Sequence, residues 1–356
     1  MKVAYKDVIR DLVVSCPFPI DPDIQLSGRA PSMASSQFLT NKEQGEWAEE
    51  VVLRAINDPA SGYVALKAGR SDSISADDPR FPQFFAAYQA ELNDLGKRPD
   101  ILVYESAVLD DLHTTKLDDA TISRATAAIE VRSSSFLATK YNEFTSARTN
   151  QATRESERIR RELTAPPFEA LLLEKAPGIH EILANATPDT LRDLSFRSRR
   201  WSSSQTLRDL SDRLRELKAQ LALLQKRDHL SITPKLEDIA LVDRWIQRYD
   251  VPHFYLQVFF DKAYIISFKS ILQTISDPSN EGEMFSVEED VKNQHKTTFK
   301  VDLRAAREII GRIDMPDHHS EMRELNRGRL LFYVSFTGGK GYLDLEVFME
   351  EVIGAH

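Results

Sequence analysis

The amino-acid sequence predicts a mixed α/β fold, in which helices flank a central sheet and a helical insertion interrupts the chain. Two short runs at 100–105 and 127–132 are continuously apolar, which is typical of strands buried on both faces. Residues 140–228 are more polar and mostly helical in pattern. Helices and strands alternate again after Leu230, so we expect the two outer parts of the chain to form one core.

The N-terminal elements lead into the two apolar strands. In order, we expect a helix at 41–57, a short strand at 62–68 and an amphipathic helix at 81–95 that ends at Gly96. The first helix places Trp47 and Val51 on one apolar face, and Thr40 or Asn41 is its expected cap.

The insertion carries a seam of leucines. Their 3-4-3-4-3 spacing is typical of one face of a helix of about five turns. The six residues are Leu207, Leu210, Leu214, Leu217, Leu221 and Leu224. We favour a helix packed inside an intramolecular hairpin; the alternatives are a subunit contact or an arm that faces DNA.

The C-terminal part predicts further helices and strands. In order, we expect a helix at 236–249, a strand pair at 254–260 and 264–268, and a third β region in which 330–336 turns into 342–347. The turn would be Gly338-Gly339-Lys340-Gly341, which lacks the spacing of a phosphate-binding loop. His318 and His319 are expected to be solvated in a polar linker. We divide the chain into 1–139 and 229–356, which form the core, and the insertion 140–228.

Composition narrows the class of protein. The apolar share of 42% and the charged share of 28% are ordinary for a soluble globular protein. Cys16 is the single cysteine, so an internal disulfide is excluded and a reducing cytoplasm is expected. The N-terminus lacks an apolar signal core and no run approaches membrane-spanning length, so we expect no membrane partner.

Charge is distributed unevenly along the chain. A net charge of −9 argues weakly against a nucleic-acid partner, because neutralising phosphates usually leaves a basic signature. The segment from Arg197 to Arg227, however, contains nine basic and three acidic residues, a net charge of +6. We interpret this segment as a local basic footprint on an acidic protein.

The two apolar strands each carry a carboxylate beside a basic residue. Asp100 follows Arg98 and Pro99, and Glu130 stands two residues before Arg132. Either acid alone could be a solvated strand end, but buried carboxylates are unfavourable unless they are paired or bind metal. Mg²⁺ takes oxygen ligands and usually only one or two protein carboxylates. The pair therefore predicts the metal site of a phosphodiesterase.

Other side chains could assist at this site. Arg132 cannot accept a proton near neutral pH but can hold a phosphate oxygen, so we assign it a positioning and charge-stabilising role. Lys140 and Lys235 could supply an ammonium, although each is more simply a surface lysine. Of the acids Glu46, Glu49 and Glu50 on the first helix, Glu46 is slightly favoured to reach the metal or its water. The alternative is a solvated acidic face near the N-terminus of the helix.

The pair Pro99-Asp100 with Glu130-Val131-Arg132 resembles the PD-(D/E)XK nuclease superfamily. The longer segments 128–136, 230–238 and 251–261 are similar to bacterial type II restriction endonucleases, and more narrowly to the AccI-like group. The resemblance extends from about Gln44 to the C-terminal β region, and Arg132 stands where the superfamily has lysine. It implies a restriction-endonuclease-like core with a mixed central sheet.

The resemblance also implies an activity. This is Mg²⁺-dependent hydrolysis of both strands of double-stranded DNA at a short sequence, which leaves 5′-phosphate ends. Asp100, Glu130 and the Val131 carbonyl would hold the metal. A homodimer, a cognate DNA methyltransferase and a bacterial or archaeal cytoplasm belong to the same expectation. For DNA contact the first choices are Arg197, Arg199, Arg200 and Trp201, followed by Arg148 and Arg154.

Two other functions stay open from the sequence. One is a nuclease of the same fold that acts in repair or on DNA of a particular structure. The other is a non-enzymatic DNA-binding protein built on the leucine-seam helix. Discrete DNA fragments would favour restriction, whereas activity unaffected by loss of Asp100 and Glu130 would favour the binding protein.

Overall fold

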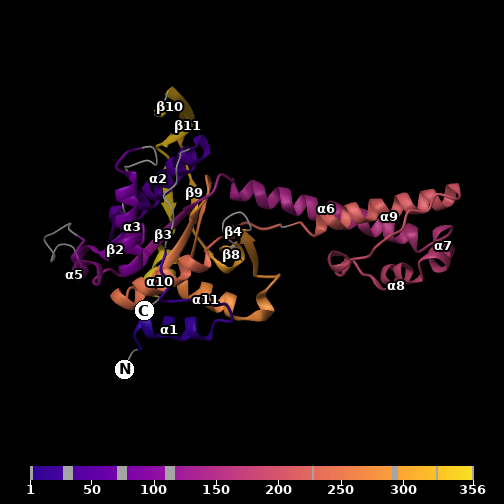
Figure 1. Cartoon of the computed structure of the whole chain (residues 1–356), viewed down its shortest axis with the longest axis horizontal. Coiled ribbons are helices and arrows are strands. Elements are labelled where there is room, and N and C mark those ends of the chain that lie inside the picture. The colour runs from indigo at the N-terminus through magenta and orange to yellow at the C-terminus, as the bar shows by residue number, and fades with distance from the viewer. Residues whose placement is uncertain are drawn as a thin grey trace. The chain divides into compact units, whose positions relative to one another are not determined.

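The computed structural model describes residues 3–26, 35–69, 78–108, 117–226, 228–290, 296–325 and 328–354. The chain forms two compact units, each of which is described by itself (Figure 1). Unit 1 combines Met1–Ala138 with Leu230–His356, and unit 2 is Thr139–His229. Unit 1 has an α/β architecture, and the described part of unit 2 is helical.

Unit 1 is built on a seven-stranded mixed sheet in the order β1-β2-β3-β5-β6-β9-β12. These strands are β1 (Tyr63–Lys67), β2 (Ile101–Glu105), β3 (Ala127–Ser133), β5 (His253–Val258), β6 (Ala263–Ser267), β9 (Arg307–Ile313) and β12 (Gly341–Leu343). Only β3 and β5 pair in parallel, and the other neighbours are antiparallel. Strands β2 and β3 are buried except at their C-terminal ends, as predicted. The mixed sheet together with its helices confirms the predicted α/β class.

Helices cover both faces of this sheet. On one face α2 (Ser36–Ile56) packs with Ile129 and Val131 in a shared apolar core. The helices associated with the other face are α1 (Tyr5–Ser15), α3 (Phe81–Leu95), α10 (Leu236–Tyr249) and α11 (Phe268–Ser276). Successive side chains of a strand point to opposite faces, so Glu130 faces away from α2 and toward α10. Shorter helices among the described residues are α5 (Asp119–Ile122) and α12 (Leu345–Phe348).

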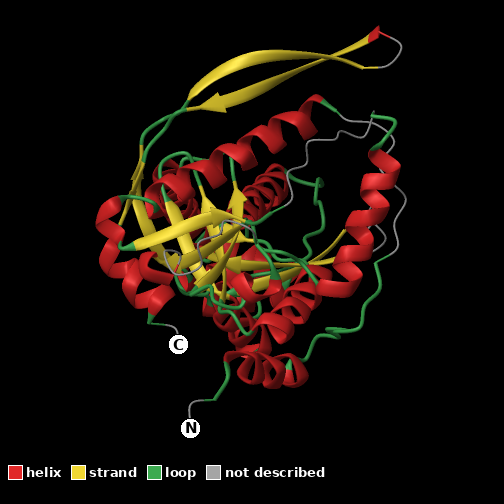
Figure 2. Cartoon of the chain, turned by 90° about the vertical axis from the view of Figure 1, so that its left-hand side faces the viewer, coloured by secondary structure: helices red, strands yellow, loops and turns green. Residues whose placement is uncertain are grey.

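Two smaller sheets complete unit 1. A three-stranded sheet has the order β4-β8-β7. Its strands are β4 (Ser231–Ile232), β7 (Phe285–Asp290) and β8 (Lys296–Asp302). A two-stranded ribbon of β10 (Asp317–Leu325) and β11 (Arg329–Thr337) extends beyond the central sheet (Figure 2). Near its turn, the ribbon packs on Leu39 of α2 through Leu325 and Leu331.

The predicted hairpin around Gly338 is wrong. Strand β11 pairs with β10 along its whole length, and β12 pairs instead with β9 at the edge of the central sheet. The glycine segment crosses between these sheets and is anchored to α2, because Trp47 Nε1–H and Arg54 both donate to the Gly338 carbonyl. His318 and His319 are exposed as expected, but they lie on β10 and not in a linker.

Two helix predictions had different outcomes. The helix expected at 41–57 begins earlier, at Ser36, where the Ser35 hydroxyl accepts the Phe38 N–H and caps the helix. Polar residues in its first turn hide this start from an apolar-periodicity argument. Helix α10 has the predicted bounds, because its apolar stripe and the following left-handed Asp250 define it locally.

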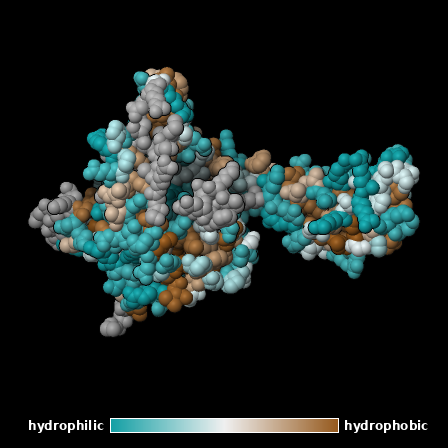
Figure 3. All heavy atoms as spheres, viewed as in Figure 1, coloured by the Kyte–Doolittle hydropathy of each residue, from teal (hydrophilic) through white to brown (hydrophobic). Residues whose placement is uncertain are grey.

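Unit 2 contains four helices in its described part: α6 (Ala138–Leu163), α7 (Phe168–Lys175), α8 (Pro177–Asn185) and α9 (Gln205–Leu224). All six seam leucines of α9 are buried against apolar residues of the other three helices. The favoured interpretation of an intramolecular packing helix is therefore confirmed. Hydrophilic residues dominate the visible surface of this unit (Figure 3).

Among the described residues, none of the helices is both long and apolar enough to span a membrane.

Candidate active site

The sheet brings the two predicted carboxylates together. Asp100 directly precedes β2, and Glu130 lies within β3, the adjacent antiparallel strand. The Val131 N–H donates to Asp100 Oδ2 at 2.7 Å, while the Asp100 N–H donates to the Ile129 carbonyl at 3.1 Å. The Glu130 side chain is only 2% exposed. Backbone pairing thus fixes both acids at one place in the sheet, where Glu130 is buried and Asp100 is half-buried.

Two cations share one oxygen of Glu130. Lys97 Nζ lies 2.7 Å and an Arg132 terminal nitrogen 3.0 Å from Glu130 Oε1. On the other side, Asp238 Oδ2 of α10 lies 3.2 Å from Arg132 and 3.7 Å from Lys97. Glu130 Oε2 is buried and has no hydrogen-bond partner among the described residues. The cluster therefore offers an oxygen that a cation could use.

The surroundings shift the pKa values of the two carboxylates in opposite directions. Burial raises the pKa of Asp100 to about 8, and the nearby charges of Glu130 and Glu49 act in the same direction. Burial also disfavours ionised Glu130, but Lys97 and Arg132 outweigh it and hold the pKa of Glu130 below its usual value. Like charges close together in a protein interior oppose joint ionisation. A bound cation would relieve this repulsion.

Lys97 reaches the cluster because its backbone is fixed to α10. The Lys97 N–H donates to the Leu241 carbonyl at 3.0 Å, and Gly96 before it has φ +81°. A Cβ atom at Gly96 would lie 2.2 Å from the Leu241 carbonyl oxygen, so only glycine fits. Sequence reasoning missed Lys97 as a site residue; the signal available was a basic residue just before Arg98-Pro99-Asp100.

A cavity of about 160 Å³ opens beside Asp100. Lys97 and Asp100 line it together with Glu49 from α2. Glu49 forms an ion pair of 2.8 Å with Lys67 at the end of β1, and burial raises its pKa. Glu49, and not Glu46, is therefore the acid of α2 that shares a cavity with Asp100. Glu46 instead pairs with Lys42 at 3.0 Å on the same helix.

The two lysines considered from the sequence lie elsewhere on the chain. Lys235 is exposed at the N-cap of α10, three residues before Asp238. Lys140 is exposed near the start of α6, within unit 2. Neither forms an ion pair with Asp100 or Glu130 within the described ranges, whereas Lys97 does with Glu130.

The predicted DNA-contact residues lie in unit 2 and differ in their surroundings. Arg197, Arg199 and Arg200 are exposed in the segment before α9, and Arg154 is exposed on α6. Trp201 packs against the leucine core, and its backbone N–H donates to Ser211 Oγ at 2.9 Å. Arg148 is half-buried and donates to the Lys226 carbonyl. Arg227, the end of the basic segment, lies outside the described residues.

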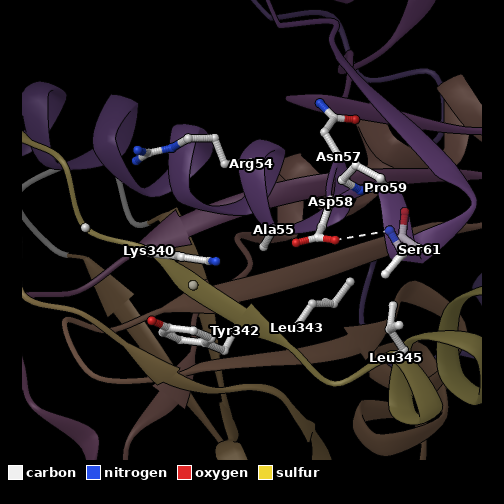
Figure 4. Close-up of a pocket in the computed structure, with 13 residues that line it drawn as sticks. Arg54, Ala55, Asn57, Asp58, Pro59, Ser61, Lys340, Tyr342, Leu343 and Leu345 are labelled. Carbon is white, nitrogen blue, oxygen red and sulfur yellow. Dashed lines mark hydrogen bonds between the residues drawn. The ribbon is translucent and has the colours of Figure 1, made fainter.

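Cavity size alone does not identify the site. A cavity of about 540 Å³ lies between the end of α2 and β12. Figure 4 shows Lys340 and Tyr342 across it from Asn57 and Asp58. None of the predicted catalytic residues lines this cavity, and its single acid, Asp58, already accepts the Ala60 N–H. The smaller cavity beside Asp100 is chemically the stronger candidate.

Within the described ranges, no group of three or more His, Cys, Asp or Glu residues is arranged to hold a metal ion. A site for Mg²⁺ does not require such a group, since this ion usually keeps several waters and uses one or two carboxylates. Asp100 and the unpartnered oxygen of Glu130 satisfy that smaller requirement.

Comparison with known proteins decides the family. The family model described as AccI restriction endonuclease matches residues 3–354, nearly the whole chain. The chain belongs to the AccI restriction endonuclease family. This AccI-family protein is accordingly a restriction endonuclease, a site-specific deoxyribonuclease that acts on double-stranded DNA. Searches of curated proteins and of solved structures found no match.

Proposed function

We propose that this AccI-family protein is a type II restriction endonuclease with a PD-(D/E)XK core, which hydrolyses both strands of DNA in a Mg²⁺-dependent reaction. The observation that carries the proposal is the meeting of Asp100, just before β2, with Glu130 on the adjacent strand β3. Glu130 Oε2 has no hydrogen-bond partner among the described residues. Burying two acids together is unfavourable unless they are paired or bind a cation, and the pairing with Lys97 and Arg132 engages only one oxygen of Glu130. The expected products carry 5′-phosphate ends.

The proposed metal ligands are Asp100, Glu130 and the carbonyl of Val131. In a strand, the N–H and C=O of one residue point to the same edge. The Val131 N–H reaches Asp100, so its carbonyl is directed toward the same edge, just beyond the start of β2. When bound, Mg²⁺ would lower the pKa of a coordinated water and offset charge developing on the scissile phosphate.

The protein's own residues would orient the reactants. Arg132 is proposed to position Glu130 and to stabilise charge, because it bridges Glu130 and Asp238 at 3.0 and 3.2 Å. Glu49 lines the same cavity as Asp100 and would orient water within it. Fixed charges and dipoles in a buried site stabilise developing charge more strongly than water does.

Unit 2 is proposed to contact DNA. Arg197, Arg199, Arg200 and Arg154 present exposed guanidinium groups that suit phosphate. Trp201 and Arg148 are more firmly built into the unit and would support this surface. A two-fold homodimer would match a palindromic target, and a cognate DNA methyltransferase would protect the host in a bacterial or archaeal cytoplasm.

The test is to incubate the purified protein with plasmid DNA and Mg²⁺ and to map both cleavage ends. We expect discrete, reproducible fragments with 5′-phosphates. Smearing, or cleavage confined to branched DNA, would contradict sequence-specific restriction and favour a repair or structure-selective nuclease of the same fold. Absence of cleavage together with DNA binding would favour a non-enzymatic DNA-binding protein.

A further inference from the structure

Lys97 is the ammonium group that the fold holds beside the two carboxylates. We propose that Lys97, from the segment between α3 and β2, is a catalytic residue that contacts the scissile phosphate and the attacking water. In this arrangement Arg132 is a positioning residue that holds Glu130. The inference rests on the proposed nuclease function and names the residue that replaces the lysine absent from position 132.

The cavity distinguishes the two cations. Lys97 lines the cavity beside Asp100, and Arg132 is not among the described residues that line it. The Arg132 guanidinium is engaged by Glu130 and Asp238, at 3.0 and 3.2 Å. Of the two cations paired with Glu130, Lys97 is therefore the one that a phosphate beside Asp100 would meet, while Arg98 in the same cavity is paired with Glu91.

The hydrogen-bonding capacity of Lys97 supports the same role. An ammonium has three donors. One is directed to Glu130 Oε1 at 2.7 Å, and the distance of 3.7 Å to Asp238 is longer than a hydrogen bond. Within the described part of the chain, two donors are thus available for substrate and water.

Backbone anchoring makes this position reproducible. Gly96 adopts a conformation that glycine favours and lies against the Leu241 carbonyl, which also accepts the Lys97 N–H. Catalytic groups must be held close to the productive geometry, and a displacement of about 1 Å can cost about a hundredfold in rate. A lysine meant only for the surface would not need such a restraint.

The experiment compares lysine variants of the full-length protein on DNA of known sequence. Single-turnover cleavage is measured with Mg²⁺, and DNA affinity is measured separately with Ca²⁺ in place of Mg²⁺. We expect Lys97→Met to slow cleavage by roughly a hundredfold or more. DNA affinity should change by less than about threefold, since Lys97 supplies only one of many phosphate interactions. The matched control is Lys262→Met, which removes a lysine from another 2.8 Å ion pair, with Glu308, and should cleave as the wild type does.

A relocated lysine separates chemistry from structure. The double variant Lys97→Met with Arg132→Lys should cleave at least about tenfold faster than Lys97→Met alone, because the ammonium returns to the site from β3. A double variant no faster than Lys97→Met would mean that Lys97 serves only its ion pair with Glu130, which overturns the proposal.

Three further outcomes are decisive. If circular dichroism shows that Lys97→Met does not fold, Lys97→Arg is tested instead, because arginine can keep the ion pair with Glu130. Wild-type cleavage by Lys97→Arg would show that an ammonium is not required and would overturn the proposal. If Lys97→Met cleaves within about threefold of the wild type while Asp100→Asn is inactive, the role of Lys97 is wrong and the nuclease function stands. If Asp100→Asn also retains full activity, the proposed function itself fails.

Discussion

The charges of unit 1 and unit 2 are organised in opposite ways. At the candidate active site Glu130, Lys97, Arg132 and Asp238 meet from three separate parts of the chain, with Glu130 buried and its partners partly buried. In unit 2 many of the ion pairs join residues three or four positions apart on the same helix, such as Arg158 with Glu155 at 2.9 Å. The first arrangement is built by the tertiary fold, and the second arises locally.

This contrast indicates where the chemistry is concentrated. Exposed pairs three or four residues apart contribute about 0.5 kcal/mol or less, so a chain can form or dispense with them at little cost. Buried charges are unfavourable unless their partners are well placed, so a buried cluster with an unpartnered oxygen indicates a ligand. Unit 2 would then supply a charged surface for DNA, and unit 1 the chemistry.

The greatest loss of activity should follow from neutralising the buried carboxylates. Asp100→Asn and Glu130→Gln keep the side-chain shape but remove a metal ligand, so cleavage should fall by roughly a thousandfold, equal to about 4 kcal/mol. Single-turnover cleavage measures this decrease. DNA affinity is measured alongside in Ca²⁺-containing buffer. Unchanged cleavage in both variants would contradict the assignment of the chemistry to unit 1.

The next effect concerns the core of unit 2. Leu214 is fully buried in the seam, so Leu214→Ala should lower the free energy of unfolding by about 2–5 kcal/mol. Urea unfolding measures the change, and Leu223→Ala, at a half-buried position on the same helix, should cost less. A loss of stability that depends on protein concentration would instead indicate that the leucines join subunits.

A smaller effect is expected from the exposed arginines of unit 2. Replacing Arg197, Arg199 and Arg200 by alanine should weaken DNA binding and lower the slope of log affinity against log salt by about 0.9 for each phosphate that is no longer neutralised. The charge-matched control replaces Arg158, Arg161 and Arg192, which are all ion-paired. Equal losses of affinity in both triple variants would show that net charge, not this segment, determines binding.

A separate effect is expected on the pH dependence of stability without metal. Because burial raises the pKa of Asp100 from 3.8 to about 8, the folded state keeps a proton that the unfolded chain releases. Stability should therefore fall as the pH rises from about 4 to about 8 and then level off. Asp100→Asn should lack this decline and melt a few degrees higher at pH 8 in a chelator. Parallel melting curves for the two proteins would contradict the shifted pKa.

Local sequence patterns account for much of this fold. The continuous apolar runs predicted β2 and β3 with their acids, the leucine spacing predicted α9, and the apolar stripe predicted α10. Each of these signals is contained within a single element. The paired strands of the ribbon were missed because the choice of β10 over β12 as partner of β11 depends on contacts with α2.

The site was only partly predictable for the same reason. Asp100 and Glu130 are visible because a carboxylate in an apolar strand is unusual. Lys97 lies between elements, and its position depends on a hydrogen bond to Leu241, far along the chain. The choice of Glu49 over Glu46 depends on the rotation of α2 against β1, which helical spacing alone does not determine.

The proposed chemistry depends above all on Asp100 and Glu130 holding the divalent cation together. Cleavage of the polypeptide itself by Fe²⁺ in place of Mg²⁺, with ascorbate and peroxide, locates the ion, because the radicals formed cut the backbone next to it. We expect cuts near residues 97–101 and 129–132, which excess Mg²⁺ suppresses and Glu130→Gln abolishes. Cuts confined to other segments, or a pattern unchanged in Glu130→Gln, would contradict this assignment of the metal ligands.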